Sequence, residues 1–391
     1  MHLTLHLTSR CDLRCRYCYA APHRGGDMTL DTAKKAIGIG MAHLRKRSPE
    51  ASLGVIFFGG EPMLMRGLIE DIIGHCQSLE RDTGQLFHYK ITTNGMLLDE
   101  DFVTSPLTSE VFIALSHDGI RAAHDANRID PSGAGTFDAL EPKIEMLLKH
   151  KPYTPVMMVI TPGAVRYYAK SIEHLYSKGF RYLICSLDYS ADWTEKALGE
   201  LEKQYRKLAD WYYRLMIDEA KFYFSPFEVK ISSHVFPGSC RAERCELGQT
   251  QISVAPNGRL YPCVQFVGDG SDLTYAIGDV DTGIDEKARL RLYEWNGEEK
   301  PTCADCAIRE RCNHYCGCLN KQATGHIDQV SPLLCAHERL IMPIADRLAA
   351  RLFEKRSPMF IQKHYNEMFP VISLVEDRTT RPQVSAGLPR R

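Results

Sequence analysis

Cysteine is the residue type whose number and spacing point most clearly to chemistry in this chain. Of its 14 cysteines, three fall within the first twenty residues and nine lie between Cys240 and Cys335 inclusive. In a short secreted protein this density predicts disulfides, but 391 residues without a signal peptide favour metal ligation by thiolates. The remaining two, Cys76 and Cys185, each lie in an apolar run, and we expect them to be buried structural residues.

The first group, Cys11-x3-Cys15-x2-Cys18, places three thiols within eight residues. A [4Fe-4S] cluster has four irons, so a loop with three cysteines leaves one iron free to bind another molecule. The alternative is a structural zinc site, which is normally closed by a fourth ligand that His6 or His23 could supply.

The elements that must position this loop have the pattern of alternating strands and helices. Leucines at positions 3, 5 and 7 alternate with polar residues and predict a strand that runs directly into the first cysteines. Further apolar segments predict strands at 55–58, 89–93, 111–115, 156–160 and 182–187, separated by helices such as 137–148 and 168–177. About six βα units by residue 190 predict an α/β fold with a parallel sheet, curled into a partial (β/α)6 barrel like that of triosephosphate isomerase.

Polar segments follow three of these strands. Gly59-Gly60-Glu61-Pro62 comes after the second strand, Asn94-Gly95 after the third, and Ser116-His117-Asp118-Gly119 after the fourth. Parallel α/β folds place their chemistry at the carboxyl ends of the strands. We therefore expect these segments to lie beside the first cysteine loop.

The motif Cys-x3-Cys-x-aromatic-Cys, with Tyr17 as the aromatic residue, resembles that of radical SAM enzymes. The resemblance implies a [4Fe-4S] cluster held by Cys11, Cys15 and Cys18, with S-adenosylmethionine (SAM) on the fourth iron. It also implies reductive cleavage of SAM to a 5′-deoxyadenosyl radical that abstracts a hydrogen atom, which ordinary side chains cannot do.

The same resemblance assigns the SAM contacts. Tyr17 would pack on the adenine, and the segment Gly59, Gly60, Glu61 and Pro62 would bind the amino group, with Glu61 meeting the ammonium. Ser116 would lie near the ribose. Arg128, within a family-like stretch from His124 to Phe137, would be the partner of the SAM carboxylate.

The later cysteines resemble the SPASM extension of many radical SAM proteins. The pattern is Cys245-x12-Gly258-x4-Cys263, then Cys303-x2-Cys306-x5-Cys312-x3-Cys316, then Cys335. By resemblance, one auxiliary [4Fe-4S] cluster would take Cys240, Cys245, Cys263 and Cys316, and a second would take Cys303, Cys306, Cys312 and Cys335. Cys318 is surplus: we prefer it as a bystander, although it could replace one of the eight. Zinc knuckles are the alternative, but C-x2-C occurs only once in this region.

The domain organisation follows from this change of character along the chain. We expect a radical SAM core domain over residues 1–232, a small cysteine-rich SPASM domain over 233–340, and a C-terminal helix with a loose tail over 341–391.

Substrate class rests on resemblance alone. SPASM proteins act mostly on peptides and proteins, and anaerobic sulfatase-maturating enzymes typically carry an aspartate where Val264 follows Tyr261-Pro262-Cys263. The stretch more closely resembles maturases that install thioether links in ribosomally made peptides. The alternatives are a formylglycine-forming oxidase of the sulfatase type and, from another class, a zinc-stabilised scaffold protein.

The resemblance also implies partners. These are a precursor peptide, recruited through a leader peptide or by a separate recognition protein because the catalytic strand begins at Leu3, and a flavodoxin- or ferredoxin-type electron donor.

Charge and hydropathy argue against other partners. Lys and Arg number 48 against 49 Asp and Glu, so no net field attracts nucleic acid or an anionic membrane surface. No segment approaches the ~20 apolar residues of a membrane-spanning helix. We expect a cytoplasmic enzyme that binds neither nucleic acid nor membrane.

Overall fold

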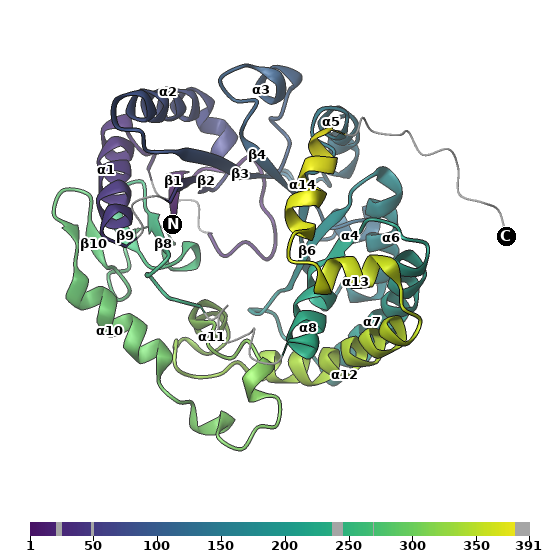
Figure 1. Ribbon diagram of the computed structural model, residues 1–391. Coiled ribbons are helices and arrows are strands. Elements are labelled where there is room, and N and C mark those ends of the chain that lie inside the picture. The colour runs from purple at the N-terminus through teal and green to yellow at the C-terminus, as the bar shows by residue number, and fades with distance from the viewer. Residues whose placement is uncertain (21–25, 48–50, 237–244, 269, 380–391) are drawn as a thin grey trace.

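A computed structural model describes residues 1–20, 26–47, 51–236, 245–268 and 270–379. Its strands form one sheet in the order β11-β10-β9-β8-β1-β2-β3-β4-β5-β6-β7, which is curled so that helices surround it (Figure 1). None of the described helices is both long and apolar enough to cross a lipid bilayer.

The six predicted strands are confirmed and pair in parallel. They are β1 (His2–Thr8), β2 (Leu53–Gly59), β3 (Phe87–Thr93), β4 (Phe112–Ser116), β5 (Pro155–Ile160) and β6 (Tyr182–Leu187). The short β7 (Tyr223–Phe224) continues the sheet beyond β6. All six strands therefore end at one mouth of the partial barrel.

Helices between these strands cover the outer face of the sheet (Figure 1). They are α1 (Leu30–Arg47), α2 (Arg66–Thr83), α3 (Glu100–Thr104), α4 (Arg121–His124), α5 (Phe137–His150), α6 (Tyr168–Lys178), α7 (Glu195–Ile217) and α8 (Ser225–Val235). Local chemistry sets their ends: the Thr194 hydroxyl accepts a hydrogen bond from the Ala197 N–H at the start of α7, and Gly84 ends α2 with a φ of 72°.

Strand β1 is buried on both faces, whereas its period-two pattern predicts only one buried face. Leu3, Leu5 and Leu7 are fully buried, but Thr4 and His6 are buried as well. The reason is that β1 is an interior strand, with β2 on one side and β8 (Gln251–Val254) on the other.

The cysteine-rich segment extends this sheet, which the sequence did not predict. Strand β8 pairs in parallel with β1, and β9 (Arg259–Tyr261), β10 (Gly278–Asp279) and β11 (Gly283–Ile284) continue from it in antiparallel fashion. The helices α10 (Glu286–Gly297) and α11 (Gly317–Thr324) follow.

The C-terminal part is helical. The expected helix is α12 (Pro332–Glu354), and two helices that the sequence analysis missed, α13 (Pro358–Tyr365) and α14 (Phe369–Thr379), come after it. Residue 232, where we expected a domain boundary, lies inside α8. Most of the expected tail, residues 380–391, lies outside the described residues.

Candidate active site

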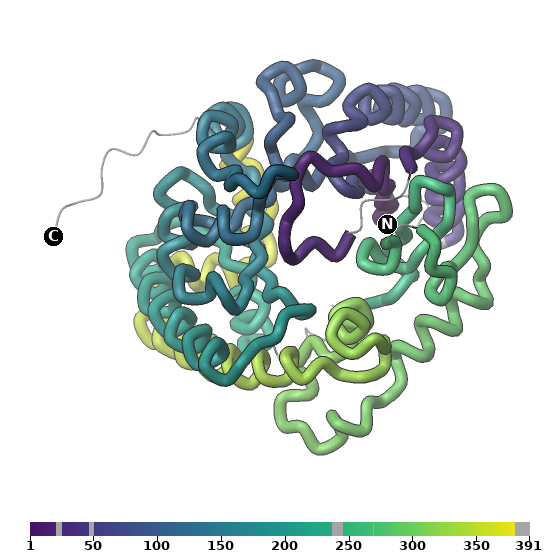
Figure 2. The backbone as a smooth tube through the Cα atoms, turned by 180° about the vertical axis from the view of Figure 1, so that it is seen from behind, coloured from purple at the N-terminus to yellow at the C-terminus, as the bar shows by residue number. Residues whose placement is uncertain are grey.

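The loop that carries Cys11, Cys15 and Cys18 leaves the carboxyl end of β1 and crosses the interior of the ring of elements (Figure 2). Its backbone is held by a second segment: the Arg14 N–H donates to the Ile129 carbonyl at 2.7 Å, and the Arg16 N–H donates to the Asn127 carbonyl at 3.0 Å. The three cysteines are thus displayed by a loop whose path is fixed by backbone hydrogen bonds.

The thiols of this loop lie close enough to influence one another. Burial raises the pKa of Cys11 to about 12 and also raises that of Cys15, with the Arg128 guanidinium acting in the opposite direction on Cys15. Since the thiolate is the metal ligand, iron must displace a proton from each of these thiols when it binds. The Asn94 amide fixes the loop from the end of β3 by donating to Asp12 Oδ1 at 2.7 Å.

The glycines after β2 are required by the cysteine loop itself. The Gly60 N–H donates to the Thr8 carbonyl and the Glu61 N–H donates to the Arg10 carbonyl, both at 2.8 Å. A Cβ on Gly60 would stand 2.1 Å from the Arg10 oxygen, and Gly59 has a φ of 134°. The sequence analysis attributed the need for glycine here to the close approach of SAM. In the structure the close approach is between two segments of the protein backbone.

The Glu61 carboxylate, only 1 % exposed, ties the ends of two strands together. Its Oε1 accepts from the Met63 N–H at 3.0 Å and from the Thr93 hydroxyl at 2.7 Å, and its Oε2 accepts from the Asn94 N–H at 2.8 Å. Burial raises the pKa of Glu61 to about 7 despite these donors. Pro62 begins a short 3₁₀ helix, Pro62–Met65, and this carboxylate caps its start.

Asp118 is a centre of the site that the sequence analysis did not single out. Its Oδ2 accepts from the Tyr17 hydroxyl at 2.6 Å and from Arg128 Nε at 3.1 Å, and its Oδ1 accepts from Arg128 Nη2 at 3.3 Å and from the Val159 N–H at 3.2 Å. Arg128 also lies over the Tyr17 ring, with its guanidinium carbon 5.4 Å from the ring centroid. The structure therefore joins the predicted SAM contacts Tyr17 and Arg128 through one buried carboxylate.

The family-like stretch from His124, the last residue of α4, to Phe137 lies beside Asp118. His124 Nδ1 accepts from the Asp118 N–H at 3.4 Å, and Asp125 Oδ1 accepts from the Phe137 N–H at 2.9 Å. A Cβ on Gly135 would clash with the Asp125 carboxylate at 2.2 Å. Ser116, the predicted ribose neighbour, is half-buried at the end of β4.

The structure describes one of the two proposed fourth zinc ligands. His6 packs its ring against Phe58, with centroids 5.3 Å apart, and His23 lies outside the described residues. Among the residues that the structure describes, no three His, Cys, Asp or Glu side chains converge as a single metal ion requires.

The later cysteines gather into two groups. Thiol group I contains Cys245, Cys263, Cys316 and Cys318; the Cys316 and Cys318 sulfurs are 3.3 Å apart, and the Cys318 thiol also donates a hydrogen bond to Cys263. These bonds lower the pKa of Cys263 and of Cys316. Cys240, which we expected here, lies outside the described residues.

Thiol group II contains the other four predicted ligands. The Cys335 thiol lies within electrostatic range of Cys303, Cys306 and Cys312. That these four thiols hold one cluster stays a prediction. The donor sets suit iron–sulfur clusters, because soft thiolates are the ligands such clusters take.

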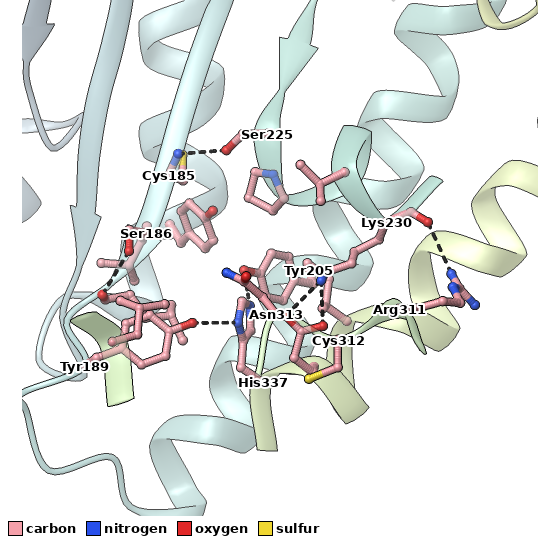
Figure 3. Close-up of a pocket in the computed structure, with 18 of the residues that line it drawn as sticks. Cys185, Ser186, Tyr189, Tyr205, Ser225, Lys230, Arg311, Cys312, Asn313 and His337 are labelled. Atoms are coloured by element: carbon pink, nitrogen blue, oxygen red, sulfur yellow. Dashed lines mark hydrogen bonds and ion pairs between the residues drawn. The ribbon is translucent and has the colours of Figure 1, made fainter. Parts of the chain in front are cut away.

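A cavity of about 340 Å³ opens between the barrel and the cysteine-rich segment (Figure 3). Its lining includes the last residues of β5 and β6, Ile160 and Leu187, and also Cys312 of thiol group II. Cys185 lines it too, whereas Cys76 is fully buried in the core as expected.

Hydrogen bonds order the polar side of this cavity. The His337 ring is hydrogen-bonded to the Tyr205 hydroxyl at 2.9 Å and to the Tyr189 hydroxyl at 3.3 Å (Figure 3). Lys230 donates to Glu338 at 2.8 Å, and the third charged residue of the lining, Arg311, donates to Asp346 at 2.6 Å.

Comparison with known proteins gives a domain match and a fold. Residues 5–164 match the radical SAM superfamily. A cysteine-type anaerobic sulfatase-maturating enzyme of Clostridium perfringens (strain 13 / Type A) is 23% identical over 331 residues, which cover 78% of this chain and 83% of that protein. A serine-type anaerobic sulfatase-maturating enzyme of Klebsiella aerogenes is 23% identical over 325 residues, covering 78% of this chain and 76% of that protein.

Solved structures show the same fold. Native anSMEcpe with bound AdoMet superimposes with a TM-score of 0.74 at 17% identity, covering 90% of this chain and 98% of that one. Streptococcus suis SuiB bound to precursor peptide SuiA gives a TM-score of 0.54 at 16% identity, covering 85% of this chain and 75% of that one. The predicted α/β radical SAM fold is confirmed.

Proposed function

This chain is an enzyme with a radical SAM domain, and on that premise we propose that it modifies a ribosomally made precursor peptide by installing a thioether or related side-chain crosslink. The match of residues 5–164 to the radical SAM superfamily supports an enzyme over the scaffold alternative. The observation that carries the proposal is Val264, which follows Cys263 where a sulfatase-type enzyme would place its aspartate. A valine side chain cannot accept a proton.

Cys11, Cys15 and Cys18 would hold the [4Fe-4S] cluster, and with SAM bound that cluster supplies the 5′-deoxyadenosyl radical. The chain's own residues position the cysteine loop and the SAM contacts, and they exclude water from them. Glu61 fixes the ends of β2 and β3 beside the loop, and Asp118 fixes Tyr17 and Arg128. Both carboxylates are almost fully buried, so this side of the site is closed to solvent.

The cavity supports a peptide as substrate. It lies at the carboxyl ends of β5 and β6, where the chemistry of parallel barrels is found. Its volume is at the lower end of the range of about 300–1,000 Å³ that ligand pockets occupy, which suits a side chain of a longer substrate. Solved structures of anSMEcpe and SuiB contain peptides, named as Cp18Cys peptide and precursor peptide SuiA.

Two auxiliary [4Fe-4S] clusters complete the proposal. One would be held by Cys240, Cys245, Cys263 and Cys316 and the other by the four cysteines of thiol group II, and their role would be to accept the second electron that is lost when a crosslink forms. We keep the flavodoxin- or ferredoxin-type donor as the source of the reducing electron.

Formation of formylglycine is the second candidate, because likeness to anaerobic sulfatase-maturating enzymes over 78% of this chain favours it. The two candidates differ in product. A crosslinked peptide loses two hydrogens per link, whereas formylglycine places an aldehyde on a single residue.

The first test is SAM cleavage by anaerobically purified protein supplied with a strong reductant. Wild type is expected to be brown, with about twelve irons per chain, and to release 5′-deoxyadenosine. Replacing Cys11, Cys15 and Cys18 together by Ala is expected to abolish cleavage while the absorbance of the auxiliary clusters remains. Cys76→Ala is the matched control, because this buried thiol lies in α2 outside all three groups. Cleavage by the triple variant would contradict the assignment.

The second test concerns the product. A small Cys-rich peptide encoded next to the gene is co-expressed with the enzyme and analysed by mass spectrometry, and Cys- and Ser-containing sulfatase peptides are supplied in parallel. Loss of two hydrogens per link in the first peptide supports the proposal. An aldehyde in the sulfatase peptides, with the first peptide unchanged, would replace it with the second candidate.

A further inference from the structure

Cys318 is one cysteine more than the two auxiliary sets require, yet it is not packed as a bystander. It is 7 % exposed, its sulfur is 3.3 Å from that of Cys316, and its thiol donates to Cys263. A buried cysteine without a ligand role behaves as a small apolar side chain among apolar neighbours. Here the sulfur instead lies between two other thiols.

The backbone explains how residues 316 and 318 can face the same point. Two residues apart within a helix, side chains do not face each other. Cys316, however, is the residue before α11 and has a φ of −74° and a ψ of 89°, so only Cys318 has helical geometry. Gly317 between them must be small, because a Cβ there would lie 2.6 Å from the Asn296 side-chain oxygen.

Backbone groups at the start of α11 also act on two other thiols of group I. Burial raises the pKa of Cys245, with the Gly317 backbone acting in the opposite direction, and the Cys318 side chain lowers the pKa of Cys316, with a smaller effect in the same direction from the Leu319 backbone. Backbone N–H groups at a helix start favour negative charge, and N–H donors to sulfur are a common second layer around iron–sulfur clusters. These backbone groups act on two of the four thiols, while burial still raises the pKa of Cys245 and hydrogen bonds to Cys263 and Cys316 raise that of Cys318.

Thiol group I lies toward the first cysteine loop. Tyr19, the residue after Cys18, is within electrostatic range of Cys18, Cys263 and Cys318. Cys263 and Cys318 are thus both near the residue that follows the third cysteine of the loop.

We propose that Cys318 is an iron ligand, and that Cys245, Cys263, Cys316 and Cys318 together hold the auxiliary cluster of thiol group I. The inference rests on the proposed function, since it takes the presence of that cluster from there. Each of the four thiols loses one proton to solvent and forms one iron–sulfur bond, with no change in the number of electrons. The four irons then each have a protein thiolate, and Cys240 is not needed as a ligand.

The test compares three single variants of the full-length, anaerobically reconstituted protein by iron content and by electron paramagnetic resonance of the reduced clusters. Cys318→Ala is expected to contain about eight irons instead of about twelve and to lose one auxiliary signal. Cys240→Ala and the control Cys76→Ala are expected to keep about twelve irons and all signals.

Three outcomes would overturn the inference: full iron in Cys318→Ala, loss of a cluster only in Cys240→Ala, or loss of a cluster in both. The proposed function fails separately, if wild type itself lacks iron or releases no 5′-deoxyadenosine.

If Cys318→Ala does not fold, Cys318→Ser provides the same test at nearly unchanged volume. Oxygen in place of a ligating sulfur is expected to shift the auxiliary signal or to release the cluster. A signal identical to wild type at full iron content would overturn the inference.

Discussion

Asp118→Asn is the substitution that most directly tests how the candidate site is held together. Asp118 and Arg128 are 3 % and 6 % exposed and form an ion pair at 3.1 Å. Each carboxylate oxygen accepts two hydrogen bonds, from the Tyr17 hydroxyl, the Val159 N–H and two guanidinium nitrogens. In the Asp118→Asn variant one of these oxygens becomes an NH2 group, which is itself a donor. It would then face two hydrogen-bond donors, one of them Arg128, at either position.

The expected magnitude follows from the burial of the pair. Removing one partner of a buried ion pair leaves the other charge uncompensated, which costs about 3–5 kcal/mol. At 1.36 kcal/mol per tenfold change in an equilibrium constant, this lowers the protection of local amides by about a hundred- to several-thousand-fold. Native-state hydrogen exchange over residues 112–128 measures that loss locally, without assuming two-state unfolding of the whole chain.

Asp138→Asn is the matched control. Asp138 also pairs with an arginine, Arg121, but the two side chains are 71% and 56% exposed, so solvent screens their attraction. We expect no change in exchange for this variant. Adding Arg128→Met to Asp118→Asn removes the unpaired charge and is expected to restore part of the protection. Equal exchange in Asp118→Asn and Asp138→Asn would refute the reasoning.

Three further predictions concern the loop, the substrate and the metal. Gly60→Ala is expected to lower the iron bound by the first cysteine loop, because its Cβ would meet the Arg10 carbonyl, whereas Gly67→Ala, with no atom within 4 Å, is expected to leave iron content unchanged. Val264→Asp is not expected to yield formylglycine in sulfatase peptides analysed by mass spectrometry, because substrate docking also differs. Removing iron with a chelator is expected to increase hydrogen exchange over residues 303–335 more than over α6, because metal binding and folding are coupled where the core is small.

The strands of the barrel could be predicted because each is a short apolar run between helical or turn segments. The prediction for 182–187 agrees with β6 to the residue, and the others agree to within two residues at either end. Strands β8 to β11 could not be predicted in this way, because they are two to four residues long. The pairing of β8 moreover depends on contact with β1, about 250 residues earlier in the chain, and not on local pattern.

The candidate site divides in a similar way. Thiols could be grouped from their spacing and resemblance, and in the structure Cys335 lies within electrostatic range of the other three thiols of group II. The role of Asp118 was missed because it depends on the long-range approach of Tyr17 and Arg128, although its place after a predicted strand was a usable signal. Cys318 was judged by spacing alone, and spacing cannot show that the residue before a helix turns its side chain toward the second helical residue.

The position of β1 explains why the two cysteine-bearing parts of the chain have a fixed relationship. The strand that ends in the first cysteine loop pairs with β8 through His2 to Leu5, opposite Gln251 to Val254. From β8 a tight antiparallel connection leads through β9 to Cys263, two residues beyond the end of that strand. The distance between the loop and thiol group I is therefore set by backbone hydrogen bonds within one sheet. The proposed function includes electron transfer between clusters held at these two places. Because such transfer depends steeply on the separation of the centres, a shared sheet suits it better than a flexible linker between two domains would.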